Sequence, residues 1–295
     1  MSKFELVVFI RHKFSTSNSI IDELWDKKVI GVHYENIDSF NSEDYKNLKE
    51  STRKTLKSIF DLMELIQEKG ALVAADYKNV TNKDEKKNKA LLVGIIEKGA
   101  EKKSLWFTDK ESGKEYCYKT MKMKETKEIY YEDYPILLSC KPRLTTMCQW
   151  HMMKNKLPSI YSGKPLLEEV TSLMASELEV ICYEYLRNEK LTCLLLPIGR
   201  TLDDVDIVGL NEQGRKIFAQ VTFSDKNKVI MKKTNQLLNN RRSEKTDLYF
   251  FGPEIIKTTV NGLNEKINFV SIETVFKTMK SKREAKEAIA IMLNK

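Results

Sequence analysis

The sequence predicts two domains of mixed helix and strand. The first is an α+β domain built on a curved sheet or small barrel, and the second is an α/β domain with a central mixed sheet. Short strand-like segments dominate the first half, whereas helical and strand-like segments alternate in the second. A chain of 295 residues is also long enough for two domains. The stretch 151–167, with two prolines and a glycine, is the expected linker between domains at 1–150 and 168–295.

In the N-terminal half, apolar runs of strand length alternate with polar loops. A serine-asparagine pair before an apolar periodic stretch predicts a helix over 17–27, and apolar residues at helical spacing predict another over 42–69, which Gly70 ends. The expected strands cover residues 4–10, 28–34, 71–77, 90–99, 104–109 and 117–125, and the domain closes near Trp150.

In the C-terminal half, the apolar pattern switches between helical and strand spacing. The expected helices cover residues 166–188, 226–240 and 273–295. The expected strands cover residues 191–197, 203–210, 216–223, 246–253 and 267–272, and a tight turn joins the second and third of these strands.

The charge balance favours a polyanionic partner. The chain has 50 Lys and Arg against 42 Asp and Glu, which gives a net charge of +8. A lysine-rich surface with no nucleic-acid partner is the alternative explanation, since such surfaces also keep proteins soluble.

The cysteines and the N-terminus indicate a reduced, cytoplasmic protein. None of the five cysteines forms a Cys-x-x-Cys pair or clusters with the three histidines, so the sequence does not predict a structural zinc site. Glu5, Arg11 and His12 interrupt the first apolar run, which is therefore neither a signal peptide nor a membrane span. We expect no membrane partner.

Two strands near residue 210 carry the residues with the clearest chemistry. Strand alternation places Asp206 on one side of the first strand, and Gln220 and Thr222 on one side of the second. If the turn at 212–214 pairs these strands, a carboxylate and an amide oxygen converge. Such oxygens bind a hard cation such as Mg²⁺, for which Mn²⁺ is the expected substitute, and a bound cation activates water against a phosphodiester.

This arrangement resembles the PD-(D/E)XK nuclease superfamily, and within it the Mrr-type restriction endonucleases. The resemblance implies a restriction-endonuclease-like fold in which a helix glutamate, Glu179, assists a metal held by Asp206 and Gln220. Glu177 takes the place of Glu179 if the helix register differs. The resemblance thus assigns Glu179, Asp206 and Gln220 as both catalytic and metal-binding residues.

The lysine position of this superfamily is occupied by Thr222. A cation from elsewhere is needed for activity, because the superfamily lysine orients water and offsets charge in the transition state. The candidates are the lysines that follow the second strand: Lys226, Lys228, Lys232 and Lys233.

Each of these residues also has a purely structural explanation. Aspartates before a glycine turn are common in α/β proteins, and a glutamate on an amphipathic helix usually faces solvent. The chain order of Glu179, Asp206 and Gln220, followed by a basic helix, favours the nuclease interpretation.

The N-terminal half resembles the PUA superfamily, and especially its EVE-type modules. Five segments carry the resemblance: VVFIRHKFSTSNS, WDKKVIGVHY, GALVAADY, LLVGIIEKG and KPRLTTMCQW. It implies a curved sheet with a pocket for a modified base that is flipped out of DNA. The expected pocket residues are aromatic or can form hydrogen bonds: Trp25, His33, Tyr34, Trp106 and Trp150. Their alternative place is the core of the domain.

Contacts to the DNA backbone are expected from basic residues near both domains' predicted sites. The named candidates are Arg11, Lys13, Arg143, Arg241 and Arg242.

Together these features predict a modification-dependent, type IV-like restriction endonuclease that cleaves DNA with Mg²⁺. One alternative is a sequence-specific type II restriction endonuclease. Others are a non-catalytic DNA- or RNA-binding protein with a degenerate nuclease fold, and a protein-interaction scaffold. A homodimer is the expected assembly, since cutting both strands ordinarily needs two active sites.

Overall fold

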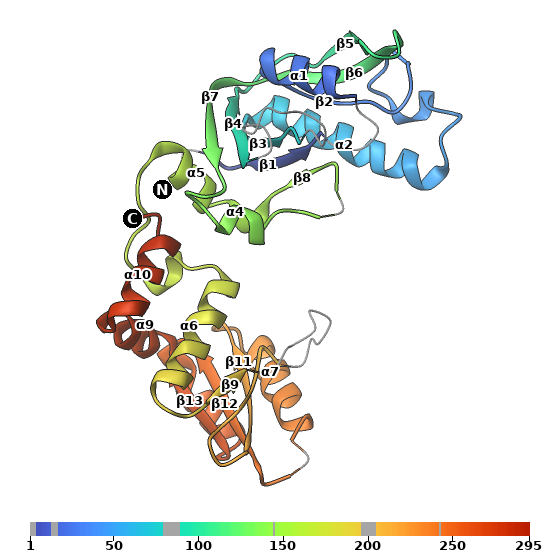
Figure 1. Cartoon of the computed structure of the whole chain (residues 1–295). Helices are drawn as coiled ribbons and strands as arrows, with labels where there is room; N and C mark the ends of the chain where they lie inside the picture. Colours follow the sequence, from blue (N-terminus) through green and yellow to red (C-terminus); the bar gives the residue numbers. More distant parts are fainter. Residues whose placement is uncertain (1–3, 13–16, 79–88, 144, 196–204, 242) are drawn as a thin grey trace. The chain divides into compact units, whose positions relative to one another are not determined.

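The computed structural model describes residues 4–12, 17–78, 89–143, 145–195, 205–241 and 243–295. The chain divides into two compact units, and the division falls between Pro165 and Leu166. We call residues 1–165 the N-terminal unit and residues 166–293 the C-terminal unit. Figure 1 shows their helices and strands.

The strands that the structure describes in the N-terminal unit form two open sheets. The five-stranded sheet has the order β7-β4-β3-β1-β8, in which β1 and β3 are parallel and the other neighbours antiparallel. The three-stranded sheet has the antiparallel order β2-β6-β5. The strands are β1 Val7–Arg11, β2 Val29–Val32, β3 Ala71–Asp76, β4 Ala90–Ile96, β5 Lys103–Thr108, β6 Glu115–Lys122, β7 Lys124–Tyr130 and β8 Met147–Gln149.

Local residues explain where the first long helix of this unit begins and where the second ends. The Ser17 side chain caps the first by accepting a hydrogen bond from the Ile20 amide, and Gly70 ends the second at a positive φ of 74°. The helical segments are α1 Asn18–Asp26, η1 Ser42–Asp44, α2 Glu50–Lys69, α4 Ile136–Ser139, η2 His151–Met153 and α5 Lys156–Ser162.

The expected small barrel is not seen, because the described strands of this unit form two open sheets. The stretch 117–125 reads as one strand in the sequence but belongs to two. Met123 separates β6, which pairs with β2 and β5, from β7, which pairs with β4. Glu125, with a φ of 47°, lies just after this change of sheet.

The expected linker contains helical structure and lies mainly in the N-terminal unit. Residues 151–165 include η2 and α5, and the latter ends at Gly163 in the left-handed conformation. The buried side chains of Leu157 and Ile160 explain why this stretch is ordered.

The described strands of the C-terminal unit form one mixed sheet. Its order is β13-β12-β11-β10-β9, with β9, β10 and β11 antiparallel and β11, β12 and β13 parallel. The strands are β9 Leu194–Leu195, β10 Ile207–Leu210, β11 Lys216–Val221, β12 Thr246–Gly252 and β13 Ile267–Ser271. This agrees with the α/β class and the central mixed sheet that the sequence predicts.

Helices cover both faces of this sheet. One apolar cluster joins α6, α9 and α10 to alternate residues of β11 such as Ile217 and Ala219, and another joins α7 and α8 to Leu248 and Phe250 of β12. The helical segments are η3 Val170–Ser172, α6 Ala175–Asn188, α7 Asn227–Asn239, η4 Glu254–Ile256, α8 Lys257–Leu263, α9 Ile272–Ser281 and α10 Arg283–Met292.

Three expected helices differ from those observed. The stretch 42–69 does not form one helix, because α2 begins only at Glu50, after the short η1. The stretch 166–188 does not form one helix, because α6 begins only at Ala175 after the short η3. The stretch 273–295 contains two helices, since Lys282 adopts an extended conformation between α9 and α10. The break lets both helices place apolar residues, Met279 and Ile289, in one cluster.

No helix within the described ranges combines the length and the apolar character needed to cross a membrane.

Candidate active site

The hairpin of β10 and β11 brings Asp206 and Gln220 together as the sequence predicts. Ile207 pairs with Ala219 and Val208 with Phe218, and the amide of Asp206, just before β10, donates to the Ala219 carbonyl at 2.9 Å. Gln220 lies on the same face of β11 as Phe218. This face is the one that α7 covers, since Phe218 and Val208 pack in the cluster of α7 and α8. Gln220 is fully buried, whereas the Asp206 side chain is 23% exposed.

Lys233 of α7 connects these two residues. Its Nζ donates to Asp206 Oδ2 at 2.8 Å and to Gln220 Oε1 at 2.7 Å. Asp206 Oδ2 also accepts a hydrogen bond from the Val221 amide at 2.7 Å, which fixes the carboxylate against β11. The carboxylate and amide oxygens therefore converge on one cationic group.

The geometry of α7 explains why Lys233, and not another candidate lysine, reaches the site. Helical residues advance by about 100° each, so Lys233 lies beside the buried positions Ile230, Thr234 and Leu237. The other three candidate lysines lie on exposed positions: Lys226 at the start of the helix, and Lys228 and Lys232 on its outer side.

Glu179 comes from α6 and lies within electrostatic range of the same site. Burial raises the pKa of its carboxyl, the Asp206 charge raises it further, and Lys233 opposes these effects. Glu179 makes no hydrogen bond to Asp206 or Lys233 among the described contacts. Its alternative, Glu177, caps α6 instead, because its Oε2 accepts a hydrogen bond from the Met174 amide at 2.8 Å.

Cys182 provides an apolar neighbour for Glu179. It is fully buried in the cluster of α6 and α9, and burial, followed by the charges of Glu179 and Asp206, raises the pKa of its thiol well above the usual range.

Thr222 does not supply a cation. It is buried just after β11, and its Oγ1 accepts a hydrogen bond from the Ser224 amide at 3.0 Å. This small turn leads the chain from the sheet into α7, which carries Lys233.

The donor atoms suit a hard divalent cation. Asp206 offers a carboxylate, Gln220 an amide oxygen and Glu179 a second carboxylate close by, which are the ligand types that Mg²⁺ prefers. The Lys233 ammonium is a cation held by two of these groups. Over the described ranges no three His, Cys, Asp or Glu side chains are arranged to hold a metal, so the amide of Gln220 would be needed.

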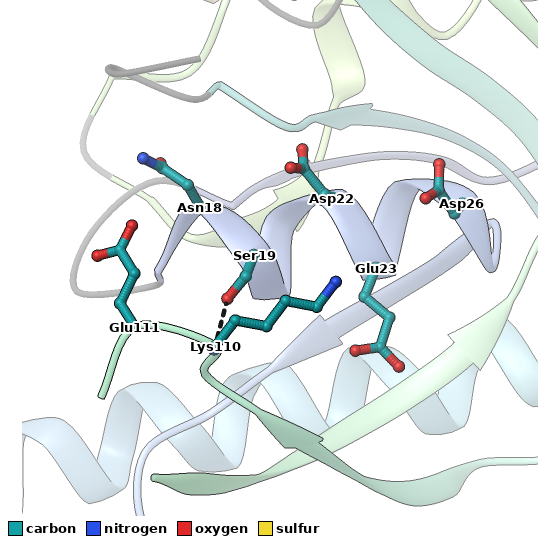
Figure 2. Close-up of a pocket in the computed structure, with 7 residues that line it drawn as sticks. All are labelled: Asn18, Ser19, Asp22, Glu23, Asp26, Lys110 and Glu111. Carbon is teal, nitrogen blue, oxygen red and sulfur yellow. Dashed lines mark hydrogen bonds between the residues drawn. The ribbon is translucent and has the colours of Figure 1, made fainter. Parts of the chain in front are cut away.

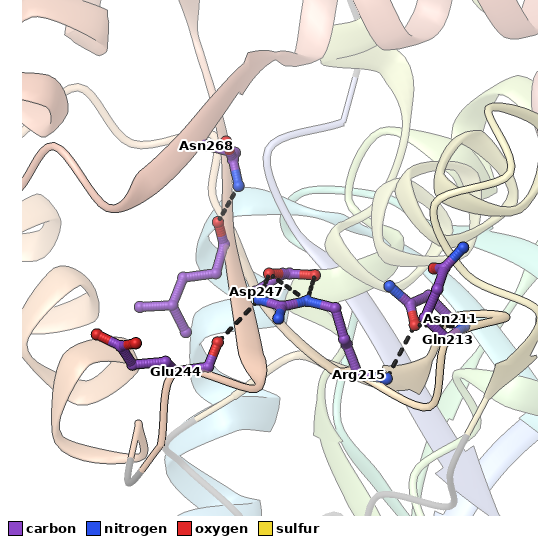
Figure 3. A network of polar contacts seen from close by, with 7 residues as sticks. Asn211, Gln213, Arg215, Glu244, Asp247 and Asn268 are labelled. Atoms are coloured by element: carbon purple, nitrogen blue, oxygen red, sulfur yellow. Dashed lines mark hydrogen bonds and ion pairs between the residues drawn. The ribbon is translucent and has the colours of Figure 1, made fainter.

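A polar network stabilises the far end of the hairpin (Figure 3). Arg215 Nε donates to both carboxylate oxygens of Asp247, at 3.1 and 2.9 Å, and its NH2 group donates to the Glu244 carbonyl at 2.8 Å. The Asn211 side chain accepts from the Gln213 and Arg215 amides within the turn. These contacts tie the hairpin to the start of β12, at the end of β11 opposite to Gln220.

The residues expected to form a base-reading pocket do not all lie on one surface. Trp25 packs in the same cluster as Val8 and Ile10, whereas Trp150 packs edge-on against Phe9 at 5.2 Å between ring centroids. Successive residues of β1 point to opposite faces of the sheet, so the two tryptophans lie on opposite faces. Both are buried, at 6% and 2% exposure. The prediction is therefore wrong for Trp25 and Trp150, which are core residues.

The other three expected pocket residues lie near the three-stranded sheet. His33 Nδ1 is 3.0 Å from the Cys117 carbonyl, and its ring packs against Tyr116 and Tyr118. Tyr34 is partly buried against the core, and Trp106 on β5 is 49% exposed. Of the five, only Trp106 offers a large exposed aromatic surface.

Arg11 is not available for a phosphate contact. Its guanidinium donates to the Arg143 carbonyl at 2.6 Å and to the Pro142 carbonyl, and its Nε lies 3.7 Å from Asp76 Oδ2. The side chain is only 12% exposed. The prediction for Arg11 is therefore wrong, because the fully buried Asp76 carboxylate, which Lys141 also contacts, binds it internally.

The other residues expected to contact phosphate differ in their exposure to solvent, and two of them are not described by the structure. Lys13 and Arg242 lie outside the described residues. Arg143 is exposed, whereas Arg241 is partly buried, and its buried Nε has no hydrogen-bond partner among the residues that the structure describes.

The sequence interpretation did not find the Arg11, Asp76 and Lys141 group, although one signal was present. Arg11 and Asp76 are the charged last residues of two apolar strands, and the carboxyl ends of parallel strands such as β1 and β3 meet at one edge.

A pocket on the N-terminal unit has the wrong charge for nucleic acid (Figure 2). It lies between α1 and the turn after β5, and the Lys110 amide donates to Ser19 Oγ across it at 3.1 Å. Four carboxylates and one lysine are among its lining residues, which are Asn18, Ser19, Asp22, Glu23, Asp26, Lys110 and Glu111. Phosphate groups would be repelled here.

Comparisons with known proteins add little to this site. No protein-family model matches the chain, and no curated protein matches it. Among solved structures, the chain is similar to the crystal structure of a repair endonuclease from Pyrococcus abyssi, with a TM-score of 0.25 and 11% sequence identity. The match covers 62% of this chain and 77% of that chain, and a TM-score of this size does not establish a shared fold.

Proposed function

We propose that the chain is an endonuclease that hydrolyses DNA phosphodiester bonds with Mg²⁺ at Asp206, Gln220 and Glu179. The observation that carries this proposal is the Lys233 ammonium, which lies within hydrogen-bond distance of both Asp206 and Gln220. It combines the two oxygen donors and the cation of a phosphodiesterase site in one place, although the cation comes from α7 and not from the position of Thr222.

Each side chain has a distinct role in this proposal. Mg²⁺, when bound, supplies charge at the phosphate and lowers the pKa of a water molecule. Asp206 and Gln220 hold the ion, and the hydrogen bond from the Val221 amide keeps the Asp206 carboxylate oriented. Glu179, whose pKa burial raises, is suited to accept a proton from the attacking water. Lys233 offsets the charge that develops on the phosphate oxygens.

DNA is the proposed substrate because the net charge of +8 favours a polyanion. The finer proposal is that the N-terminal unit restricts cleavage to DNA with modified bases, as a type IV-like restriction endonuclease does. This part rests on the sequence resemblance, with His33, Tyr34 and Trp106 as the remaining candidates for contact with a base. A type II enzyme with the same site would cut unmodified DNA at a specific sequence.

The experiment compares the native chain with Asp206→Ala on unmodified, methylated and hydroxymethylated plasmid DNA, with Mg²⁺ or Mn²⁺. We expect Asp206→Ala to lower the cleavage rate by about 100-fold or more, the scale for removing a group that stabilises developing charge. Asp225→Ala is the control, because Asp225 is an exposed carboxylate near the start of α7.

Three outcomes are decisive. Cleavage that persists in Asp206→Ala would reject the site. A native chain that binds DNA or RNA without cutting it would favour the non-catalytic binding protein. Equal cleavage of all three plasmids would remove the dependence on modification but keep the nuclease.

We also propose that two copies of the chain assemble on DNA for double-strand cleavage. Light scattering with and without a DNA duplex tests this, and a monomer under both conditions would contradict it.

A further inference from the structure

The cation position between Asp206 and Gln220 already has an occupant. Lys233 Nζ contacts Asp206 Oδ2 and Gln220 Oε1, and both contacts are shorter than 2.9 Å. The carboxylate and the ammonium are three-quarters buried, at 23% and 25% exposure, and Gln220 is fully buried. This protein group is therefore part of the site and not a surface lysine that reaches it by chance.

A divalent ion and the Lys233 ammonium would compete for the same oxygen atoms. Two like charges on one pair of ligands repel strongly where the surroundings exclude water. The hydrogen bond from the Val221 amide to Asp206 does not carry a net charge, so it would persist while the ammonium leaves.

The backbone of α7 does not have to move for this exchange. Ile230, Thr234 and Leu237 anchor the helix in the core beside Lys233. A lysine side chain has a flexible four-carbon stem, so the ammonium can leave by rotation of its own side chain.

We propose that Lys233 is an internal cation that a divalent metal ion displaces. In the metal-free chain Asp206 and Gln220 hold the ammonium, and metal binding releases it toward a phosphate of the substrate. This inference rests on the proposed function, since it assigns the ion to the same oxygen atoms. It adds that the lysine is stored in the site until the metal arrives.

The exchange couples metal binding to phosphate binding. A released ammonium lowers its free energy by pairing with an anion, so a phosphate and the metal each increase the affinity for the other. The coupling is reciprocal, as for any two ligands whose binding is linked.

The first test measures Mn²⁺ binding to the full chain without DNA, by titration calorimetry or by the electron paramagnetic resonance of free Mn²⁺. We expect Lys233→Met to bind Mn²⁺ at least ten-fold more tightly than the native chain, because the competing charge is gone. Lys232→Met is the matched control, since Lys232 is exposed on the outer side of α7. Unchanged or weaker binding by a folded Lys233→Met chain would overturn the proposal.

The second test uses the native chain, so it does not depend on the folding of a variant. An amine-reactive acylating reagent modifies lysines in the presence and absence of Mn²⁺, and mass spectrometry of peptides gives the extent at Lys233. We expect labelling of Lys233 to rise at least three-fold with Mn²⁺, while that of Lys232 stays constant. Constant or reduced labelling of Lys233 while Mn²⁺ is bound would contradict release of the ammonium.

Mn²⁺ binding to Asp206→Ala distinguishes failure of the cation exchange from failure of the proposed metal site. If Asp206→Ala binds Mn²⁺ as the native chain does, the ion does not bind at this site and both proposals fail. If Asp206→Ala loses Mn²⁺ binding but neither Lys233 test gives the expected result, the metal site stands and the exchange is wrong.

Discussion

The positive charge at the candidate site comes from Lys233 of α7 and not from residue 222, which is a threonine. Thr222 follows Gln220 by two residues along the chain. Lys233 comes from the next helix, α7, and its ammonium contacts Gln220. The ammonium can therefore approach the Asp206 carboxylate from a helix instead of from the strand. What matters for the chemistry is the final position of the charge and not the element that carries it.

An exchange of the two positions tests this. Lys233→Met should lower DNA cleavage by about 100-fold, the scale for removal of a charge-stabilising group. Adding Thr222→Lys should then restore at least ten-fold of the lost rate, because a lysine at 222 starts next to Gln220. The measurement is the single-turnover cleavage rate.

Thr222→Val in the Lys233→Met background is the control for the loss of the Thr222 hydrogen bond. Recovery of the cleavage rate with Thr222→Val would contradict the exchange. Failure of Thr222→Lys to restore the rate would also contradict it, provided that the melting temperature of this variant equals that of the native chain.

His12 predicts how stability depends on pH. Burial lowers its pKa to about 3 from an ordinary value of 6.5. Below pH 6.5 the unfolded chain binds a proton that the folded chain does not bind. As the pH decreases below 6.5, the free energy of unfolding should therefore decrease by about 1.4 kcal/mol per pH unit. Above pH 6.5, His12 should not affect the pH dependence of this free energy.

Urea unfolding at pH 7 and pH 5 measures this effect. Between these values the native chain should lose about 2 kcal/mol more than His12→Phe, which keeps a ring to stack on Tyr77. The exposed His151 is the control, and His151→Gln should behave as the native chain does. Equal losses in the native chain and His12→Phe would show that His12 is not the titrating group.

Sequence reasoning at this scale succeeds where the rule is local. Strand alternation and a tight turn predict that Asp206 and Gln220 approach each other, and the Lys233 ammonium contacts both side chains. Which lysine joins them depends on the docked rotation of α7, and among four lysines the pattern alone did not single out Lys233. The aromatic type of Trp25 and Trp150 likewise does not reveal which face of a sheet they pack on.

At the scale of elements, Gly209 allows β9 and β10 to approach closely. A Cβ at Gly209 would lie 2.6 Å from Thr192 Oγ1 and 3.0 Å from the Leu194 carbonyl oxygen. Gly209→Ala should therefore destabilise the C-terminal unit by about 1–3 kcal/mol, the usual cost of overpacking.

Gly262 is the matched glycine, because it lies in α8 and a Cβ added there would meet no described atom within 4 Å. Gly262→Ala should stabilise the chain by up to about 1 kcal/mol through helix propensity. Chemical denaturation measures both changes, and a neutral Gly209→Ala would show that the strands can separate without cost.

The elements that the sequence misassigned share a physical cause. Hydrophobic periodicity predicts that a segment is helical, but it does not locate a break when both sides are helical. The extended Lys282 between α9 and α10, and the late start of α6 at Ala175, are of this kind. The sequence also did not predict the change of sheet at Met123, because the residue pattern of a strand does not indicate the sheet to which it belongs. The short helix α8 was missed for lack of a long periodic pattern.

At the scale of the whole molecule, each unit has its own hydrophobic core. One large cluster lies within the N-terminal unit, and two clusters lie on the two faces of the C-terminal sheet. We expect fragments 1–165 and 166–295 each to fold alone, because cores that do not share residues do not need each other.

Each fragment should give one cooperative urea transition and native-like circular dichroism. The C-terminal fragment should also bind Mn²⁺ if the metal site is as proposed, since it contains every proposed ligand. A fragment 166–295 that remains unfolded in buffer would contradict the independence of the cores.

The four side chains of the candidate site lie between the start of α6 and the end of α7, within residues 175–239. Genes recombine in contiguous stretches, so a single exchange that carries this segment transfers the complete set of reactive groups. The N-terminal unit can then be replaced during evolution without rebuilding the chemistry. Under the proposed function, target choice and bond breaking would therefore be inherited as separable modules.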